Sequence, residues 1–320
     1  MSRLIDENLM IEIAKLYYEN NLTQAQIATK LSISRSLISK TQKKKKNMGI
    51  VEVIIHSEVI RPHKDLEDLL KQLLGMRHVR ICDIPVSGEI ENALAQEANT
   101  LLKPRLSSAK TVVVCGGQTI RAMANSFSSE LEYPNLTFVP ASGGLGECFW
   151  DSDPNHHVAT FASKCGAQQA QLYAPVFVDS VEAKEILTRQ YFLKNVLERA
   201  KQADIALVGI GKPFSAVALL EHQPPNILED LTQKKAQICG DINFNCFDND
   251  GNTLACRWNQ QIIGLSLEEI KNIPTVICIA SGTDKIVPII TGAKNHFFNS
   301  LVIDLTLAKK LYHYYYKKPF

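Results

Sequence analysis

Residues 111–119 read Thr-Val-Val-Val-Cys-Gly-Gly-Gln-Thr, and this stretch decides the class of fold. Its first five residues form a largely apolar run, of the kind found in strands that are buried on both faces of a parallel sheet. Gly116 and Gly117 predict a tight turn, because glycine adopts backbone conformations that other residues avoid. A helix is predicted to follow at residues 118–130. Strand, glycine turn and helix in this order indicate an α/β domain.

The same order recurs over residues 78–320, which we assign to one domain with a mainly parallel sheet. Strands are predicted at residues 79–84, 111–115, 136–140, 171–173, 204–209, 275–280 and 300–303. Helices are predicted at residues 89–103, 118–130, 155–166, 180–201 and 285–295. An amphipathic helix over residues 63–75 precedes them, and we assign residues 57–77 to a linker or dimer-contact helix.

The first 56 residues have a different pattern. Residues 7–20 carry apolar side chains at helical spacing, Thr23 is suited to cap a second helix, and Ser34 to cap a third. That third helix is expected to end near Gly49, and residues 50–56 have the pattern of a strand. Three short helices followed by a strand predict a winged helix-turn-helix over residues 1–56.

The charge distribution supports a nucleic-acid-binding role for this small domain. Residues 21–50 contain seven basic and no acidic residues, within a chain whose net charge is +2. A recognition helix reads base edges with its first turns, and the helix before it contacts the DNA backbone. The predicted DNA contacts are Thr23, Gln24, Arg35, Ser36, Ser39, Lys40, Lys43 and Lys44. The alternative is a helical packing module with a solvated basic face.

Three predicted strands run into turns of small residues, at 115–119, 141–146 and 281–285. The carboxyl ends of parallel strands bind ligands, and a helix N-terminus attracts anions. We therefore predict a site for a phosphorylated small molecule. Its candidates in the three turns are Gly116, Gly117, Gln118, Thr119, Ser142, Gly143, Gly144, Gly282 and Lys285. Asp241, which follows Gly240, is a candidate acceptor for sugar hydroxyl groups.

Other classes of protein and site are disfavoured. No apolar run approaches the roughly 18 residues of a membrane span, and no secretory signal is visible, so we expect a cytoplasmic protein without a membrane partner. The eight cysteines include no C-x-x-C pair, which favours buried reduced thiols. No phosphate loop or G-x-S-x-G elbow occurs, and His156 and His157 lack a third ligand at metal spacing. We predict no cofactor, no metal and no catalytic residue.

Taken together, these segments resemble the SorC family of bacterial sugar-responsive transcriptional regulators over nearly the whole chain. In the N-terminal part the resemblance lies in Ile13–Tyr18, Leu22–Ala28, Ile33–Arg35, Ile38–Lys40 and Gly49–Val51. In the rest of the chain it lies in Gly116–Thr119, Ser142–Gly146, Tyr173–Pro175, Asp204–Gly211, Gly240–Ile242, Gly282–Lys285 and Leu301–Asp304.

The resemblance implies that residues 78–320 form an effector domain similar to sugar-phosphate isomerases and deaminases, used as a sensor. It implies a homodimer or homotetramer whose binding to operator DNA changes when a sugar phosphate binds. The family's phosphate and sugar contacts would fall on Gly116–Thr119, Asn155, Asp241 and Lys285. A regulator, repressor or activator, is therefore expected rather than an enzyme. The alternative is an active sugar-phosphate isomerase or deaminase that carries a DNA-binding arm, which turnover of substrate would reveal.

Three departures from the family pattern bear on these expectations. Ser32 replaces the turn glycine of the helix-turn-helix, and Thr41 and Gln42 replace two core leucines. Ser142 stands where some branches carry a lysine that reacts covalently or an arginine that binds a second phosphate. The expected effector is therefore a monophosphate that is held non-covalently.

Overall fold

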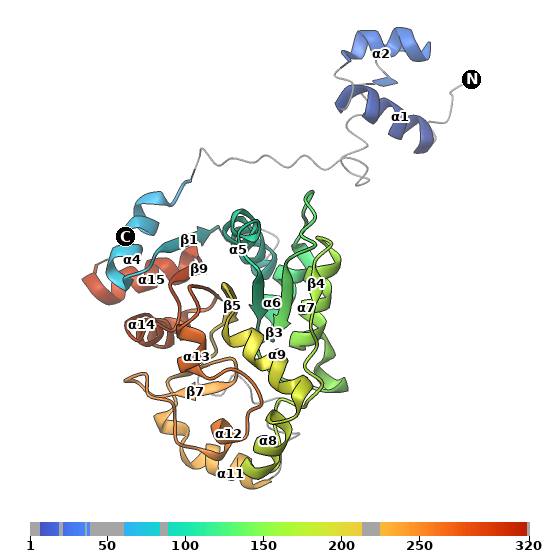
Figure 1. The fold of residues 1–320 in the computed structure, drawn as a ribbon. Helices are drawn as coiled ribbons and strands as arrows, with labels where there is room; N and C mark the ends of the chain where they lie inside the picture. Colours follow the sequence, from blue (N-terminus) through green and yellow to red (C-terminus); the bar gives the residue numbers. More distant parts are fainter. Residues whose placement is uncertain are drawn as a thin grey trace. The chain divides into compact units, whose positions relative to one another are not determined.

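The computed structural model describes residues 7–18, 22–35, 37–38, 61–83, 89–212 and 225–318 (Figure 1). By its internal contacts the chain divides into two compact units, residues 1–62 and residues 63–320.

Unit 1 contains the helices of the predicted helix-turn-helix. Helix α1 spans Glu7–Tyr18 and α2 spans Gln24–Leu31, and a third helix begins at residue 35. The Thr23 hydroxyl accepts a hydrogen bond from the Gln26 amide (3.3 Å), and the Gln26 side chain accepts one from the Thr23 amide (2.9 Å). This capping box fixes the start of α2. The helices pack around four buried side chains, Ile13, Leu16, Ile27 and Ile38.

The turn between α2 and the third helix forms without a glycine. Ser32 lies in the left-handed region, at φ 53° and ψ 43°, and its amide donates to carbonyl oxygens of α2. The replacement of the turn glycine by serine is therefore compatible with the fold. The predicted strand at residues 50–56, together with Thr41 and Gln42, lies outside the described residues.

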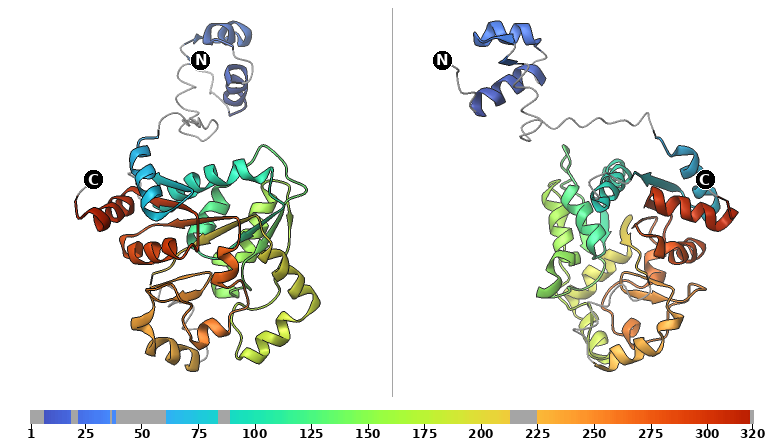
Figure 2. Two further views of the ribbon diagram at one scale, coloured as in Figure 1. Left: turned by 60° about the vertical axis from the view of Figure 1, so that its left-hand side comes forward. Right: turned by 180° about the vertical axis from the view of Figure 1, so that it is seen from behind.

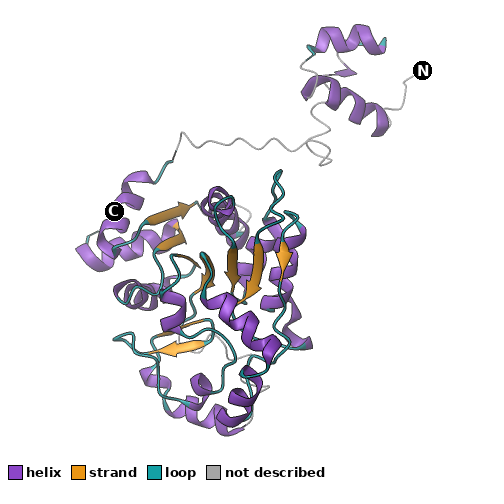
Figure 3. Cartoon of the chain, viewed as in Figure 1, coloured by secondary structure: helices purple, strands orange, loops and turns teal. Residues whose placement is uncertain are grey.

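Unit 2 is built on a seven-stranded sheet in the order β1-β9-β8-β5-β2-β3-β4 (Figure 3). All six pairings between its strands are parallel, which confirms the predicted α/β class. The strands are β1 (His78–Cys82), β2 (Thr111–Val114), β3 (Thr137–Pro140), β4 (Gln168–Gln169), β5 (Ile205–Gly209), β8 (Thr275–Ala280) and β9 (Ser300–Asp304).

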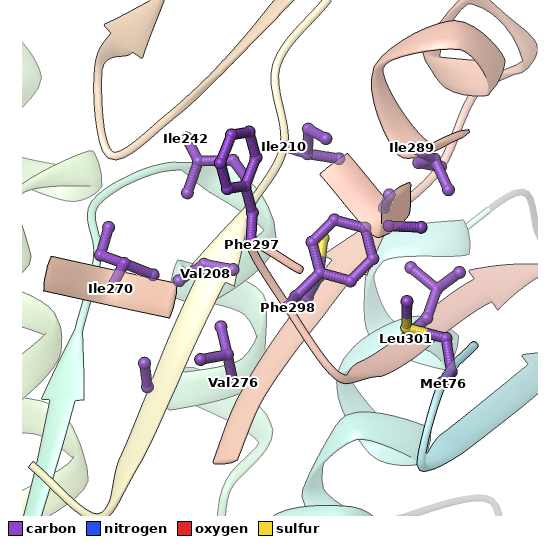
Figure 4. Close-up of a cluster of buried hydrophobic side chains, with 14 of the residues drawn as sticks. Met76, Val208, Ile210, Ile242, Ile270, Val276, Ile289, Phe297, Phe298 and Leu301 are labelled. Carbon is purple, nitrogen blue, oxygen red and sulfur yellow. The ribbon is translucent and has the colours of Figure 1, made fainter. Parts of the chain in front are cut away.

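Helices cover both faces of this sheet. One face packs against α5 (Ile90–Leu106), α6 (Gln118–Ser126) and α7 (Pro154–Ser163). The other packs against α4 (Lys64–Leu74), α9 (Tyr191–Lys201), α13 (Leu267–Lys271), α14 (Ile286–Lys294) and α15 (Leu305–Tyr316). Successive residues of a strand alternate between the two cores, as Ile277 and Cys278 do. Figure 4 shows part of the core on this second face, where Phe297 and Phe298, which precede β9, lie among side chains of β5, β8 and β9.

The remaining elements of unit 2 surround the carboxyl ends of the strands or connect them (Figure 2). Strands β6 (Gly240–Ile242) and β7 (Asn245–Phe247) form an antiparallel hairpin, whose two turn residues, Asn243 and Phe244, both have positive φ. The other elements are η1 (Glu147–Ser152), α8 (Val181–Thr188), α11 (Pro225–Gln233), η2 (Lys235–Gln237), α12 (Arg257–Gln260) and η3 (Thr283–Lys285).

Three sequence predictions about unit 2 were wrong. Residues 171–173 are not a strand, because Leu172 packs into a side cluster with Leu197 and Ile263 instead of pairing with the sheet. The helix predicted at residues 180–201 is two helices, since Gln190 has an extended backbone (ψ 133°) between α8 and α9.

The third error concerns the linker helix assigned to residues 57–77. Helix α4 belongs to unit 2, where Leu66, Leu70 and Leu74 are buried in the core of the sheet. Its amphipathic pattern therefore reflects burial against its own domain. Residues 57–60 lie outside the described residues.

Candidate effector-binding site

The strand order creates a switch point at the carboxyl edge of the sheet. After β2 the chain continues outward through β3 and β4, whereas after β5 it continues in the opposite direction through β8 and β9. In open parallel sheets ligands bind at such points, outside the carboxyl ends of the strands. The loops after β8, β5, β2 and β3 follow one another along this edge. Neighbouring strands are about 4.8 Å apart, so the ends of β2 and β8 are separated by about 10 Å.

The loop after β2 leads directly into α6 and requires both of its glycines. Gly117 has φ 111°, and a Cβ on Gly116 would lie 2.7 Å from the Ser152 carbonyl oxygen. The Gly117 amide donates to that same oxygen (2.9 Å). The backbone amides of Gln118 and Thr119, in the first turn of α6, donate a hydrogen bond to none of the described residues. These amides, with the positive end of the helix dipole, form an anion-binding position.

The loop after β8 carries Gly282 and Lys285. The Gly282 amide points to the buried Asp304 carboxylate (3.4 Å), which fixes the loop against the end of β9. Lys285 is half-buried at the N-cap position of α14 and forms no ion pair with a described acidic residue. Burial raises the pKa of the Cys278 thiol in β8 to about 12, and the positive charge of Lys285 acts in the opposite direction. A cation with no carboxylate partner in the described part of the chain is thus held at the strand ends.

Asp241 is attached to the loop after β5. The Gly211 amide donates to the Asp241 carbonyl oxygen (2.8 Å), and the two residues form an antiparallel bridge. Burial, followed by the nearby Cys278 and Asp241, raises the pKa of the Cys115 thiol at the end of β2. The bridge with Gly211 places the Asp241 backbone beside the loop after β5, the strand that is next to β2 at the switch point.

The turn after β3 is packed more tightly than the other two. Ser142 is fully buried in a bridge with Gly264, and no described residue bonds its hydroxyl. A Cβ on Gly143 would lie 2.5 Å from the carbonyl oxygens of Ala174 and Pro175, so this residue is enclosed by the chain. Gly144 lies against the carboxylate of Asp153. Ser142 and Gly143 are thus enclosed by other parts of the protein, in the layer beneath the surface of the strand ends.

Asn155, at the start of α7, lies beside this turn. Its side-chain oxygen accepts a hydrogen bond from the Leu172 amide (2.8 Å), which ties α7 to the following loop. Its Nδ2 atom would be 3.6 Å from a Cβ on Gly144. The side-chain oxygen of Asn155 is therefore hydrogen-bonded within the protein, whereas its side-chain nitrogen lies beside Gly144 of the small-residue turn.

The sequence did not identify the segment that supports the β2 loop. Ser152 accepts hydrogen bonds from Gly117 and from the Gln118 side chain (3.0 Å), and Asp153 caps α7 through the Asn155 amide (2.8 Å). Asp153 followed by proline is a signal for a helix start, but nothing in the sequence indicates its contact with the Leu145 amide (2.7 Å).

His157 is a second residue that the sequence did not assign to the site. Its imidazole is 1% exposed, and its two nitrogens each lie 3.2 Å from a carbonyl oxygen, of Cys115 and of Asp151. Burial lowers the pKa of His157 below its ordinary value of 6.5. The ring joins the end of β2 to the segment before α7.

The predicted DNA contacts are only partly described. Thr23 is the exposed cap of α2, Gln24 is the first residue of that helix, and Arg35 is exposed at the start of the third helix. These positions agree with their predicted places on the two helices. Ser36, Ser39, Lys40, Lys43 and Lys44 lie outside the described residues.

Two further observations concern the described residues only. None of their helices is long and apolar enough to cross a membrane, and no group of His, Cys, Asp and Glu side chains among them could hold a metal ion. Seven cysteines are free and buried, at positions 82, 115, 165, 239, 246, 256 and 278.

The chain is similar to known regulators along most of its length. Residues 60–313 match the family model described as "Putative sugar-binding domain". The chain is 26% identical to the deoxyribonucleoside regulator of Bacillus subtilis, over 95% of this chain and 97% of that protein. It is 24% identical to the sorbitol operon regulator of Klebsiella pneumoniae, over 96% of this chain and 98% of that protein.

Solved structures of transcriptional regulators are also similar to this chain. A DeoR family transcriptional regulator from Listeria monocytogenes is 31% identical, with a TM-score of 0.70 over 78% of this chain and 98% of that one. Full-length SorC from Klebsiella pneumoniae has a TM-score of 0.82 at 24% identity, over 96% of this chain and 98% of that one, which confirms the predicted fold class. These relatives are described as regulators, which confirms the prediction of a regulator rather than an enzyme. Since the family model covers more than half of its residues, the chain belongs to the SorC family of sugar-responsive transcriptional regulators.

Proposed function

We propose that this protein regulates transcription of a carbohydrate-utilisation operon. In this proposal unit 1 binds operator DNA, and unit 2 binds a phosphorylated sugar that changes the affinity for the operator. Both would act in the cytoplasm, where the DNA and the phosphorylated metabolite are found together.

The observation that carries the effector proposal is the pair of anion-binding features on either side of β5. Among the described residues, the backbone amides of Gln118 and Thr119 after β2 have no acceptor, and the ammonium of Lys285 after β8 has no carboxylate partner. Both features favour a phosphate, which carries up to two negative charges and several acceptor oxygens. Asp241, held at the end of β5, supplies an acceptor for the hydroxyl groups of a sugar.

Two further observations support the chemical class of the effector. The relatives include regulators named for sorbitol and for deoxyribonucleosides, which are polyhydroxylated compounds or contain a sugar. Ser142 is fully buried and carries no amine, so the β3 turn offers no Schiff base and no second cation. A sugar monophosphate that binds non-covalently fits these side chains.

The DNA-binding proposal rests on unit 1. The capped start of α2, the turn at Ser32 and the exposed Arg35 at the start of the next helix have the arrangement of a helix-turn-helix. Thr23 and Gln24 would contact the DNA backbone. Arg35, Ser36, Ser39 and Lys40 would contact bases or phosphates, and Lys43 and Lys44 phosphates.

The test of the effector proposal is calorimetric titration of Lys285→Met with a panel of sugar phosphates, their unphosphorylated sugars and inorganic phosphate. We expect this variant to lose ~10-fold or more in affinity for the sugar phosphate, because a charge-assisted hydrogen bond is worth roughly 1.5–3 kcal/mol. Binding of the unphosphorylated sugar should not decrease, since only the phosphate contact is removed.

Lys294→Met is the matched control, because Lys294 is exposed in the last turn of the same helix. It should bind the sugar phosphate as the unchanged protein does. Equal affinity in Lys285→Met and Lys294→Met would show that the phosphate binds elsewhere.

A further inference from the structure

Trp150 is an exposed aromatic side chain that the proposed effector contacts do not yet include. It is 61% exposed on η1, the short segment between the β3 turn and α7. The chain contains two tryptophans, and the other, Trp258, is 1% exposed and donates its indole N–H to the Phe244 carbonyl oxygen (2.7 Å). Trp258 is thus a core residue, whereas the indole of Trp150 remains in contact with solvent.

The backbone that carries Trp150 is fixed to the candidate phosphate position. Ser152, two residues later, bonds both the Gly117 amide (2.9 Å) and the Gln118 side chain (3.0 Å). Asp151, which lies between Trp150 and Ser152 in the sequence, forms an ion pair with Arg121 of α6. These contacts hold the end of η1 against the loop after β2 and the first turns of α6. A group bound at the first turn of α6 therefore lies close to the chain at Trp150.

The indole ring is also oriented by its neighbour. It packs edge to face with His156 of α7, with the ring centroids 5.1 Å apart and the planes at 82°. Such a contact restrains the side chain without covering it, in agreement with its large exposed fraction. Aromatic faces pack well against the C–H groups of sugar rings, and ligand sites combine such apolar surfaces with a few placed polar groups.

We propose that Trp150 packs against the ring of a cyclic sugar phosphate whose phosphate binds at the first turn of α6. This inference rests on the proposed function and adds to it the contact that recognises the carbohydrate part. The polar contacts at Lys285 and α6 bind any phosphate, whereas the indole face selects for a ring with an apolar side. Trp150 is therefore a specificity-determining residue.

The experiment uses the full chain and follows tryptophan emission during titration with a cyclic sugar phosphate and with inorganic phosphate. The sugar phosphate should shift the emission to shorter wavelength and reduce quenching by acrylamide, because it covers Trp150. Inorganic phosphate should bind without this change. Trp150→Phe should abolish the change, while the remaining emission of buried Trp258 reports that the variant is folded.

Affinities measured by calorimetry complete the test. Trp150→Ala should lose about 10-fold in affinity for the sugar phosphate and keep its affinity for inorganic phosphate, and Trp150→Phe should lose less. Leu131→Ala is the matched control, since Leu131 is 62% exposed in the loop that leads to the amino end of β3. It should bind as the unchanged protein does.

Two results would overturn the inference, and they are distinguishable. If the sugar phosphate binds the unchanged protein and Trp150→Ala equally well, without a change of emission, the inference fails and the proposed function stands. If no sugar phosphate in the panel binds the unchanged protein, the proposed function and the inference both fail.

Discussion

Two lysines at the carboxyl edge of the sheet have different electrostatic surroundings. Lys212 forms an ion pair with Asp284 (2.8 Å), and its hydrogen bond is the main reason why the pKa of Asp284 lies below its ordinary value. Lys285 follows Asp284 directly but has no carboxylate partner among the described residues. Asp284, the acidic residue nearest in sequence to Lys285, is thus already paired with Lys212. In the proposed function, Asp284 therefore competes less with the phosphate for the Lys285 ammonium.

A prediction at the scale of the residue concerns Arg35. If Arg35 reads a base, Arg35→Ala should cost about 1–3 kcal/mol in binding to the operator and little in binding to random DNA. Fluorescence anisotropy with both DNA duplexes at one salt concentration measures the difference. Equal losses on the two duplexes would assign Arg35 to phosphate contacts instead.

At the scale of the element, α7 is coupled to the end of β2 through His157. The pKa of this imidazole is lowered in the folded protein, so the unfolded chain binds the proton more readily as the pH falls below 6.5. The stabilisation by the neutral ring is therefore present above pH 6.5 and decreases as the pH falls below that value. We expect His157→Gln to remove this part of the pH dependence of the free energy of unfolding.

Urea unfolding between pH 5.5 and 7.5 tests this expectation. Tryptophan emission reports unit 2 specifically, because Trp150 and Trp258 both belong to it. His313→Gln is the control, since His313 is exposed near the end of α15, on a different helix from His157. Three parallel curves for the unchanged protein and the two variants would contradict a role for His157.

The elements also show what the sequence can predict. Strands β2, β3 and β8 were predicted within one residue of their bounds, because each is an apolar run that ends in small residues. The hairpin of β6 and β7 was not, since each strand has three residues and pairs locally. Helix α4 was predicted as a helix but misassigned, because an amphipathic pattern does not reveal which surface covers its apolar side.

The sequence likewise predicted those parts of the candidate site that have local sequence signals, and it missed the parts that distant residues contribute. The turn at Gly116 and the turn from Gly282 to Lys285 were predicted from an apolar strand pattern followed by glycine. Both of these signals are local in the sequence. Ser152 and His157 contact the β2 loop from a segment more than 30 residues away, and only the fold brings them there. The exposure of Trp150 was equally invisible, because an aromatic residue in an irregular segment has no periodic pattern.

At the scale of the whole molecule, one helix-turn-helix contacts few bases, so useful affinity for an operator requires two half-sites. We therefore predict a homodimer or homotetramer. Sedimentation velocity at micromolar concentration, with and without operator DNA, measures the assembly. A monomer under both conditions would contradict the prediction and would leave the DNA contact of unit 1 too small for specific binding.

The pairing of β1 with β9 has a consequence for how the protein is made. Within the described sheet β1 lies at one end and pairs only with β9, so residues 78–82 have no strand partner until residues 300–304 exist. Unit 1 is complete within the first 62 residues, and N-terminal domains generally fold first during synthesis. On the ribosome, the residues of unit 1 are therefore all made long before the sheet of unit 2 can close. In the proposed function, control by the effector can therefore begin only after residues 300–304 have been made and β9 has paired with β1.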